Sequence, residues 1–169
     1  MPGETTMTEH DVAMNEKLGR IGLPKPDQIG FVVRDLERAM ALYDPVFGPF
    51  HIVDFGAQQA SYHGAVPTPY DMKYAFGRMH DLEIELIEWV SGDTPHRDFL
   101  EQGHEGVHHL RFRVDELESW EARLASVGYQ RVWYDRLSPD TAYAYYERAD
   151  DPLLIELLQY PATKALAGA

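Results

Sequence analysis

An internal repeat constrains the fold of this chain more than any other feature of its sequence. The segment 109–118 aligns without a gap with the segment 28–37, and both carry phenylalanine, valine, leucine and glutamate at the same offsets. The segment 153–159 aligns with 82–88 in the same way, and each has a glutamate between apolar residues. Two matches in the same order indicate a duplicated unit, so we expect the chain to fold as two related halves.

Hydrophobic alternation and turn residues predict the elements of each half. In the first half we expect strands at 28–33, 50–55, 72–79 and 82–90, a helix at 36–44 between Asp35 and Pro45, and a loop at 58–69. In the second half we expect strands at 109–114, 131–134, 142–148 and 153–160, and a helix at 116–126. A short helix near 97–102 should connect the halves.

This order describes two βαβββ modules, and therefore an α+β fold whose sheets curl around a central metal or substrate cavity. Each module has roughly 55 to 65 residues, too few to bury a sheet alone, so the two should pack as one domain. We expect this domain at 27–161, with module one at 27–90 and module two at 107–161. The polar segment 1–26 is expected to be an N-terminal arm, and 162–169 a tail.

Composition excludes several classes of partner and of chemistry. The 169 residues include 28 acidic and 15 basic side chains, and the net charge of -13 argues against nucleic acid and anionic membranes as partners. No segment approaches the about 20 apolar residues of a membrane span, and residues 1–17 do not resemble a signal peptide, so we expect a cytoplasmic protein. The absence of cysteine leaves histidine, carboxylate and amide groups as the possible metal ligands.

Four polar side chains occupy equivalent strand positions in the two halves: Gln28, Glu85, His109 and Glu156. A carboxylate between apolar residues of a central strand is costly unless it is paired or binds a cation. One imidazole, two carboxylates and an amide oxygen form a donor set that suits Zn, Mn, Fe, Co or Ni. The pattern thus favours a divalent metal site between the two sheets.

Each of these residues also has an ordinary structural interpretation. Gln28 could be a hydrogen-bonding strand residue, and either glutamate could meet solvent or pair with Arg111. Arg111 could bind a substrate carboxylate in a bidentate manner, and Arg111 and Arg113 could instead pair with Glu83 or Glu88. Tyr143 and Tyr145 share one strand face, which is typical of packing. Five histidines lie in expected turns or at strand starts and should be exposed: His51, His63, His80, His96 and His104.

The sequence resembles the vicinal oxygen chelate superfamily, which includes glyoxalase I, methylmalonyl-CoA epimerase and extradiol dioxygenases. The resemblance covers 27–161 and rests on Asp27-Gln-Ile-Gly-Phe-Val-Val33, Ile84-Glu-Leu86, Gly106-Val-His-His-Leu-Arg-Phe-Arg-Val114 and Leu154-Ile-Glu-Leu157. The segment 92–109, with a short helix before paired histidines, is most similar to the methylmalonyl-CoA epimerase branch.

This resemblance implies a divalent ion that faces two neighbouring substrate oxygens and is held at Gln28, Glu85, His109 and Glu156. The first position is usually histidine, so Gln28 would hold the ion less tightly, or would lie behind a water or substrate ligand. The catalytic acid of the epimerase branch has no counterpart, because 67–76 offers only Asp71 as a carboxylate. The resemblance also implies Glu156, or Glu85 in second place, as the catalytic base.

Three functions remain open from the sequence. The first is a metal-dependent isomerase, epimerase or lyase that acts through an enolate of a small oxygenated substrate, a carboxylate or thioester included. The second is an Fe(II) ring-cleaving dioxygenase, which the single histidine among the ligand positions disfavours. The third is a metal-free small-molecule binding protein of the same fold. Family members also pair modules across dimers, and the aromatic residues Phe47, Phe50 and Trp89 suggest a homodimer.

Overall fold

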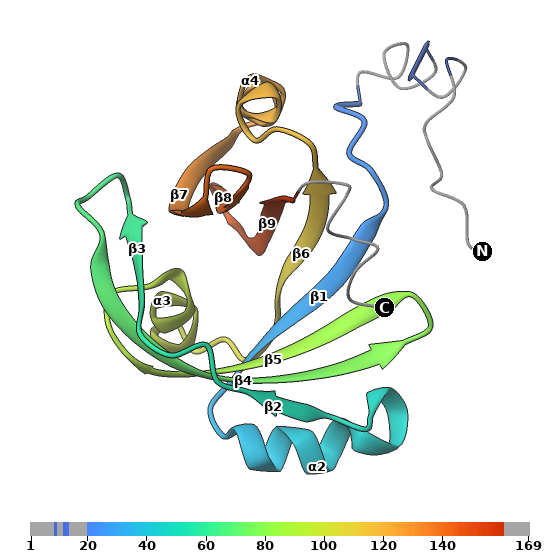
Figure 1. Cartoon of the computed structure of the whole chain (residues 1–169), viewed down its shortest axis with the longest axis vertical. Coiled ribbons are helices and arrows are strands. Elements are labelled where there is room, and N and C mark those ends of the chain that lie inside the picture. The colour runs from blue at the N-terminus through green and yellow to red at the C-terminus, as the bar shows by residue number, and fades with distance from the viewer. Residues whose placement is uncertain (1–8, 10–11, 14–19, 161–169) are drawn as a thin grey trace.

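The structure is a computed structural model that describes residues 9, 12–13 and 20–160 (Figure 1). The first half contains β1 (Pro26–Val33), α2 (Leu36–Phe47), β2 (His51–Val53), β3 (Gln58–Tyr62), β4 (Thr68–Met79) and β5 (Leu82–Ser91). After α3 (Pro95–Glu101), the second half contains β6 (Gly106–Val114), α4 (Glu118–Ser126), β7 (Tyr129–Ser138), β8 (Thr141–Arg148) and β9 (Asp151–Gln159). Most of the expected N-terminal arm and the tail at 162–169 lie outside the described residues.

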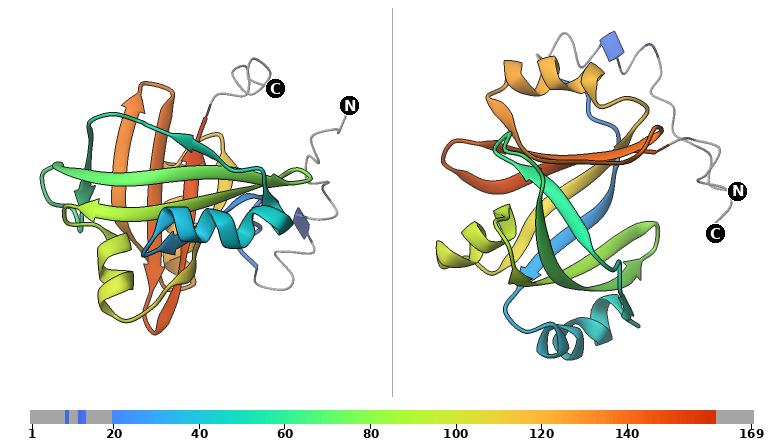
Figure 2. Two further views of the ribbon diagram at one scale, coloured as in Figure 1. Left: turned by 90° about the horizontal axis from the view of Figure 1, so that it is seen from below. Right: turned by 60° about the vertical axis from the view of Figure 1, so that its left-hand side comes forward.

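One curled sheet of nine strands contains both halves, in the order β2-β4-β3-β7-β8-β9-β6-β1-β5, and a β4–β5 pairing closes it into a ring. The halves join where β1 pairs antiparallel with β6 and where β3 pairs antiparallel with β7. Figure 2 shows α2 and α4 on opposite outer sides of this sheet. The α+β fold of two related modules is thus confirmed.

The repeat is visible in the pairing of the strands. Within module one, β1 pairs in parallel with β5, and Gly30 lies opposite Glu85. Within module two, β6 pairs in parallel with β9, and Arg111 lies opposite Glu156. These are equivalent positions of the two repeats. The four strands β9, β6, β1 and β5 are therefore neighbours, and the side chains of their inner faces point towards the centre of the ring.

Two local predictions were wrong. The segment 58–69 is not one loop, because its two ends belong to β3 and β4. A turn at His63 and Gly64, with positive φ angles of 49° and 74°, lies between these strands. Only these central residues need turn geometry, so the flanking residues remain free to pair. The helix α2 also continues past Pro45 to Phe47, because Pro45 lies in its last turn, where a missing N–H costs a single hydrogen bond.

Buried apolar residues form three clusters, one beneath each outer helix and one inside the ring. Beneath α2, Leu36 and Ala39 pack on the sheet, and beneath α4 the fully buried Leu124 does so. Ile21 and Leu23, before β1, also pack against the α4 cluster. The cluster inside the ring is rich in aromatic side chains and includes Phe99 of α3. No described helix is long and apolar enough to cross a membrane.

The three aromatic residues that suggested a dimer do not form an exposed patch. Phe50 is buried, and Phe47, the last residue of α2, packs against the same cluster. Trp89 is half-buried, and its indole N–H donates to the carbonyl of Gly92 at 2.9 Å. Contacts within the chain explain why these side chains are aromatic, so they do not support a homodimer. The homodimer stays a prediction.

Candidate metal centre

The structure brings the four predicted metal ligands together inside the ring. Gln28 lies on β1, Glu85 on β5, His109 on β6 and Glu156 on β9, so each module supplies two side chains. All four are buried, with 1%, 8%, 0% and 7% of their surface exposed, respectively. They form the quartet of donor side chains that the repeat predicts. Their role as metal ligands stays a prediction.

The donor atoms of the quartet surround Nε2 of His109. This nitrogen lies 3.1 Å from Oε2 of Glu156, 3.4 Å from Oε2 of Glu85 and 3.4 Å from Oε1 of Gln28. Two donors that each bind a metal at about 2.1 Å lie about 3.0 to 3.4 Å apart when they meet at octahedral or tetrahedral angles. The spacing of the quartet therefore matches adjacent coordination positions around one ion.

The quartet contains more acceptors than donors. His109 Nε2 carries at most one proton, yet two carboxylates and an amide oxygen face it. Among the described residues, His109 is the one group that forms an ion pair or hydrogen bond with the carboxylates of Glu85 and Glu156. Two buried carboxylates that share one donor are under-compensated, and a bound cation would remove this deficit.

The pKa values of the quartet follow from this arrangement. Burial alone would lower the pKa of His109, but the carboxylates of Glu156 and Glu85 outweigh it and raise the pKa to about 9. Burial raises the pKa of Glu85, although the neighbouring His109 opposes this shift. The two carboxylates therefore favour a positive charge at this place, whereas burial disfavours the negative charge of Glu85.

A polar network behind the quartet fixes the direction of the Gln28 amide. Gln28 Nε2 donates to Oε1 of Glu83 at 2.8 Å, so the amide oxygen turns towards His109. Arg111 donates to the same Glu83 oxygen at 3.1 Å and also binds both carboxylate oxygens of Asp27, at 3.0 and 3.1 Å. This orientation of Gln28 favours its oxygen as a ligand.

Arg111, predicted to bind substrate, lines the cavity beside the quartet but is already paired. The alternative interpretation, a pair with Glu83, is present in the structure, together with the unexpected partner Asp27. Arg113 pairs with Asp27 and not with Glu83 or Glu88. Asp27 reaches both arginines because the β1–β6 register shifts between Pro26 and Gln28, which interrupts the alternation assumed from the sequence.

A cavity of about 570 Å³ opens onto the quartet. Gln28, Glu85 and Glu156 form part of its wall, and most of the remainder is aromatic. Tyr143 and Tyr145 of β8 both face it, so the strand face they share lines the cavity as well as packing. Carboxylates, a convergent nitrogen and an enclosed apolar space are the features expected of a small-molecule site.

Sequence reasoning missed His96, which was expected to be exposed and is only 3% exposed. Thr94 caps α3 and Pro95 begins it, which turns His96 inwards at the edge of the cavity. A Thr-Pro pair before a short helix was the signal that could have indicated this. The ring of His96 stacks on that of His108, with centroids 4.7 Å apart.

His108 connects this stack to the quartet, because its Nδ1 lies 3.1 Å from Nδ1 of His109. Nitrogen atoms of His96, His108 and His109 all lie within 4.8 Å of one another. A shared ion at these three is nevertheless unfavourable, since lone pairs lie in the ring planes and the first two rings are stacked at 29°. The quartet is the better candidate metal centre.

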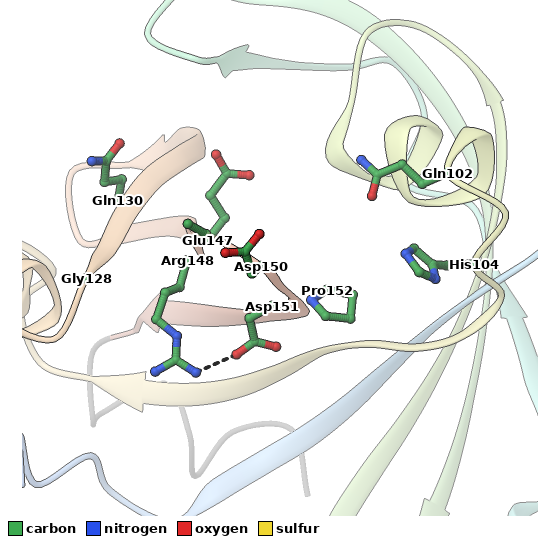
Figure 3. Close-up of a pocket in the computed structure, with 10 residues that line it drawn as sticks. Gln102, His104, Gly128, Gln130, Glu147, Arg148, Asp150, Asp151 and Pro152 are labelled. Carbon is green, nitrogen blue, oxygen red and sulfur yellow. Dashed lines mark hydrogen bonds and ion pairs between the residues drawn. The ribbon is translucent and has the colours of Figure 1, made fainter.

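A second pocket, of about 670 Å³, lies on the outside between the end of α3 and the β8–β9 turn (Figure 3). Its wall is hydrophilic, and the guanidinium of Arg148 is paired with Asp151 at 2.7 Å and stacked over Tyr129. No member of the quartet lines this pocket. The inner cavity is thus the one that combines space with chemically reactive groups.

Comparison with known families matches residues 27–145 to the Glyoxalase/Bleomycin resistance protein/Dioxygenase superfamily. The chain belongs to this superfamily. Among curated proteins, it is 29% identical over 86 residues to the uncharacterized protein YqjC of Bacillus subtilis (strain 168). That match covers 51% of this chain and only 54% of YqjC, so the chain aligns with about half the length of this relative.

Solved structures with the same fold include methylmalonyl-CoA epimerases. A complex of such an epimerase with methylmalonyl-CoA and NH4+ has a TM-score of 0.58 at 21% identity, covering 83% of this chain and 97% of the epimerase. The epimerase of Mycobacterium tuberculosis has a TM-score of 0.57 at 20% identity, with 85% and 92% covered. The hypothetical protein BH1468 of Bacillus halodurans C-125 has a TM-score of 0.55 at 20% identity, with 81% and 94% covered. These likenesses establish the fold.

Proposed function

We propose that this protein is a metal-dependent isomerase, epimerase or lyase whose ion binds at Gln28, Glu85, His109 and Glu156. The observation that carries the proposal is the pair of buried carboxylates that share His109 Nε2 as their one donor. Such a pair is stable when a cation compensates it. The superfamily and the epimerases among the structural neighbours support the same assignment.

The donor set fits a divalent transition metal. One imidazole nitrogen and three oxygens suit Mn, Fe, Co, Ni or Zn better than they suit a metal that prefers thiolates. When bound, such an ion would polarise a substrate carbonyl and stabilise the negative charge that develops after a proton leaves the neighbouring carbon. The residues of the chain must then bind the substrate and move that proton.

Glu156 is the proposed base, with Glu85 as its alternative. Both carboxylates line the cavity. The carboxylate takes the proton from carbon while the C–H electron pair moves towards the carbonyl, which gives an enolate and a carboxylic acid. An epimer forms when a second acid, for which Glu85 is the candidate, protonates the opposite face, and an isomer forms when Glu156 returns the proton to the neighbouring carbon.

Metal analysis and isotope exchange test this proposal. The purified protein is stripped with a chelator, reconstituted anaerobically with each of the five metals, and measured by plasma mass spectrometry. We expect one ion per chain, and a strong loss of bound metal in the double variant E85Q/E156Q. With the ion bound, incubation in D₂O with 2-oxo and 2-hydroxy acids, small ketones and thioesters should introduce deuterium next to the carbonyl of an accepted compound.

The single variant E156Q separates the base from the ligand role. If Glu156 moves the proton, exchange should fall by about 100-fold or more even where metal is still bound. Binding of negligible metal by the native chain would overturn the proposal and favour a metal-free binding protein, which the aromatic cavity would also suit. Uptake of O₂ with catechols in the Fe(II) form would overturn it in favour of a ring-cleaving dioxygenase.

A further inference from the structure

We infer that the substrate of the proposed centre is an uncharged aromatic compound with neighbouring oxygens, such as an aryl hydroxyketone. The inference rests on the proposed function and assigns a substrate class to the same cavity. Three properties of the cavity carry it: an aromatic wall, neutral hydrogen-bonding groups and the lack of an available cation among its described lining residues.

The cavity wall around the quartet is built from aromatic rings of several strands. Trp133 of β7 lies edge-on to Tyr70 of β4, with ring centroids 5.0 Å apart. Tyr143 and Tyr145 of β8 continue the surface, with centroids 6.3 Å apart, and Phe55 and Phe76 complete it. Rings bind to such surfaces by offset or edge-on contacts that a short aliphatic chain cannot make. A substrate with an aromatic ring therefore uses this wall best.

The polar atoms on this wall are neutral phenols. The hydroxyl groups of Tyr70 and Tyr143 lie 3.1 Å apart, and Tyr74 donates to Oε1 of Gln58 at 3.0 Å. Burial raises the pKa of Tyr143 well above its ordinary value, so this phenol stays protonated. Neutral phenols suit hydroxyl and carbonyl oxygens as partners, and they compensate a full negative charge poorly.

The charged groups of the wall disfavour an anionic substrate. Its carboxylates are Glu83, Glu85 and Glu156, and its one cationic side chain is Arg111. Arg111 already binds both oxygens of Asp27 through Nε and Nη2, and its Nη2 also binds Glu83, so its charge is compensated within the chain. A divalent ion would bring these four side chains to neutrality, which leaves no positive charge for a carboxylate or phosphate on the substrate.

The volume of the cavity agrees with a compact ligand. About 570 Å³ lies in the range of pockets that enclose a ring with a short side chain. The coenzyme A part of a thioester would have to lie outside, on a chain with a net charge of -13. The groups that line this cavity therefore differ from the positively charged groups that the multiply charged ligand of the epimerase complex would require.

A matched set of four ligands tests the inference. The metal-loaded protein is titrated with 2-hydroxyacetophenone, with benzoylformate, which keeps the ring and adds a carboxylate, with hydroxyacetone, which lacks the ring, and with propionyl-CoA. Calorimetry and the fluorescence of the tryptophans report binding. We expect 2-hydroxyacetophenone to bind at least tenfold more tightly than each of the others. Equal or tighter binding of benzoylformate, hydroxyacetone or the thioester, or no binding of 2-hydroxyacetophenone, would overturn the inference.

Two variants of Tyr143 connect the preference to the wall. Tyr143→Phe keeps the ring and should keep the tenfold preference over hydroxyacetone, whereas Tyr143→Leu removes the ring and should lose most of it. Metal content and thermal midpoint are measured in parallel and should be unchanged. Equal preference in both variants and the native chain would contradict a role for this wall.

The same ligands titrated into the metal-free protein separate the inference from the proposed function. A preference for the ring that persists in a protein unable to bind metal would contradict the function and keep the aromatic specificity. Metal binding without a preference for the ring would support the proposed function and contradict the aromatic specificity.

Discussion

Two buried histidines, His96 and His108, lie beside the quartet, and they differ in their hydrogen bonds. His108 Nδ1 is 3.1 Å from Nδ1 of His109, whereas Nε2 of His108 and both ring nitrogens of His96 have no partner among the described residues. If His109 binds an ion through Nε2, its proton is on Nδ1 and is donated to His108. Such a partner fixes both the tautomer and the ring orientation of a metal-binding histidine. We therefore expect His108 to act as a positioning residue.

Replacement of His108 should weaken metal binding. In His108→Leu the Nδ1 proton of His109 loses its acceptor, so the dissociation constant for the ion should rise by about 10- to 100-fold. His108→Asn, which can retain an acceptor oxygen, should lose less. Competition with a chromophoric chelator measures both constants, and circular dichroism verifies that each variant is folded. A folded Leu variant with native affinity would contradict the positioning role.

Replacement of His96 should have a different effect, which makes it the matched control. Because its two buried nitrogens have no partners, His96→Leu removes unsatisfied polar atoms at similar side-chain volume. We expect the free energy of unfolding in urea to stay constant or to rise by about 1 kcal/mol, with native metal affinity. A loss of stability greater than this would show that the imidazole makes a contact that Leu cannot replace.

At the scale of elements, the approach of β1 to β6 decides whether the quartet can form. Gly30 faces His109 across this pairing, and a Cβ atom on Gly30 would lie 1.9 Å from Cε1 of the imidazole. The ring of His109 occupies the space that any other residue at position 30 would fill. The Gly in the first strand of module one therefore makes room for the histidine of module two.

Gly30→Ala should consequently abolish metal binding, because the imidazole must move away from the other donors. The strain should also lower the free energy of unfolding by about 1 to 3 kcal/mol. Gly77→Ala is the control, since its Cβ would meet the carbonyl oxygen of Phe47 at 2.5 Å, on the face of the sheet that α2 covers, and would touch none of the four donor side chains. That variant should lose stability but bind metal with native affinity. Both properties can be measured by denaturation and by metal titration, and native affinity in Gly30→Ala would contradict the argument.

The repeat is also the reason that the centre of this fold could be predicted from the sequence. Matched positions in equivalent strands predicted the convergence of the quartet, and the structure shows that the strands carrying it, β9, β6, β1 and β5, are neighbours. Asp27 was missed because a register shift places it against Arg111. The aromatic wall was missed because Tyr70 and Trp133 meet only after β3 pairs with β7, a long-range contact that local periodicity does not encode. Hydrophobic patterns predict elements, whereas bulges and ring closure depend on the packed whole.

For the whole molecule, the position of the quartet has a thermodynamic consequence. All four side chains come from one chain, so the proposed centre is complete without a partner subunit, and the expected homodimer and cytoplasmic location stay separate predictions. The quartet draws two members from each module, across the β1–β6 pairing. An ion bound there would connect the two halves of the ring, and it would bind only when both are folded.

Removal of the ion should therefore lower the thermal midpoint of the whole domain in a single transition. A ligand that binds only the native state at 100 times its dissociation constant contributes about 2.7 kcal/mol. For a chain of this length, that corresponds to roughly 5 to 10 °C in the midpoint. Calorimetry with and without a chelator measures the shift, and E85Q/E156Q is the control, because its midpoint should not respond to metal. The control variant should also melt above the metal-free native protein, since it no longer buries two carboxylates that share one donor. A native midpoint that does not respond to any of the five metals, in a protein shown by circular dichroism to be folded, would contradict both the ion and its connection of the modules.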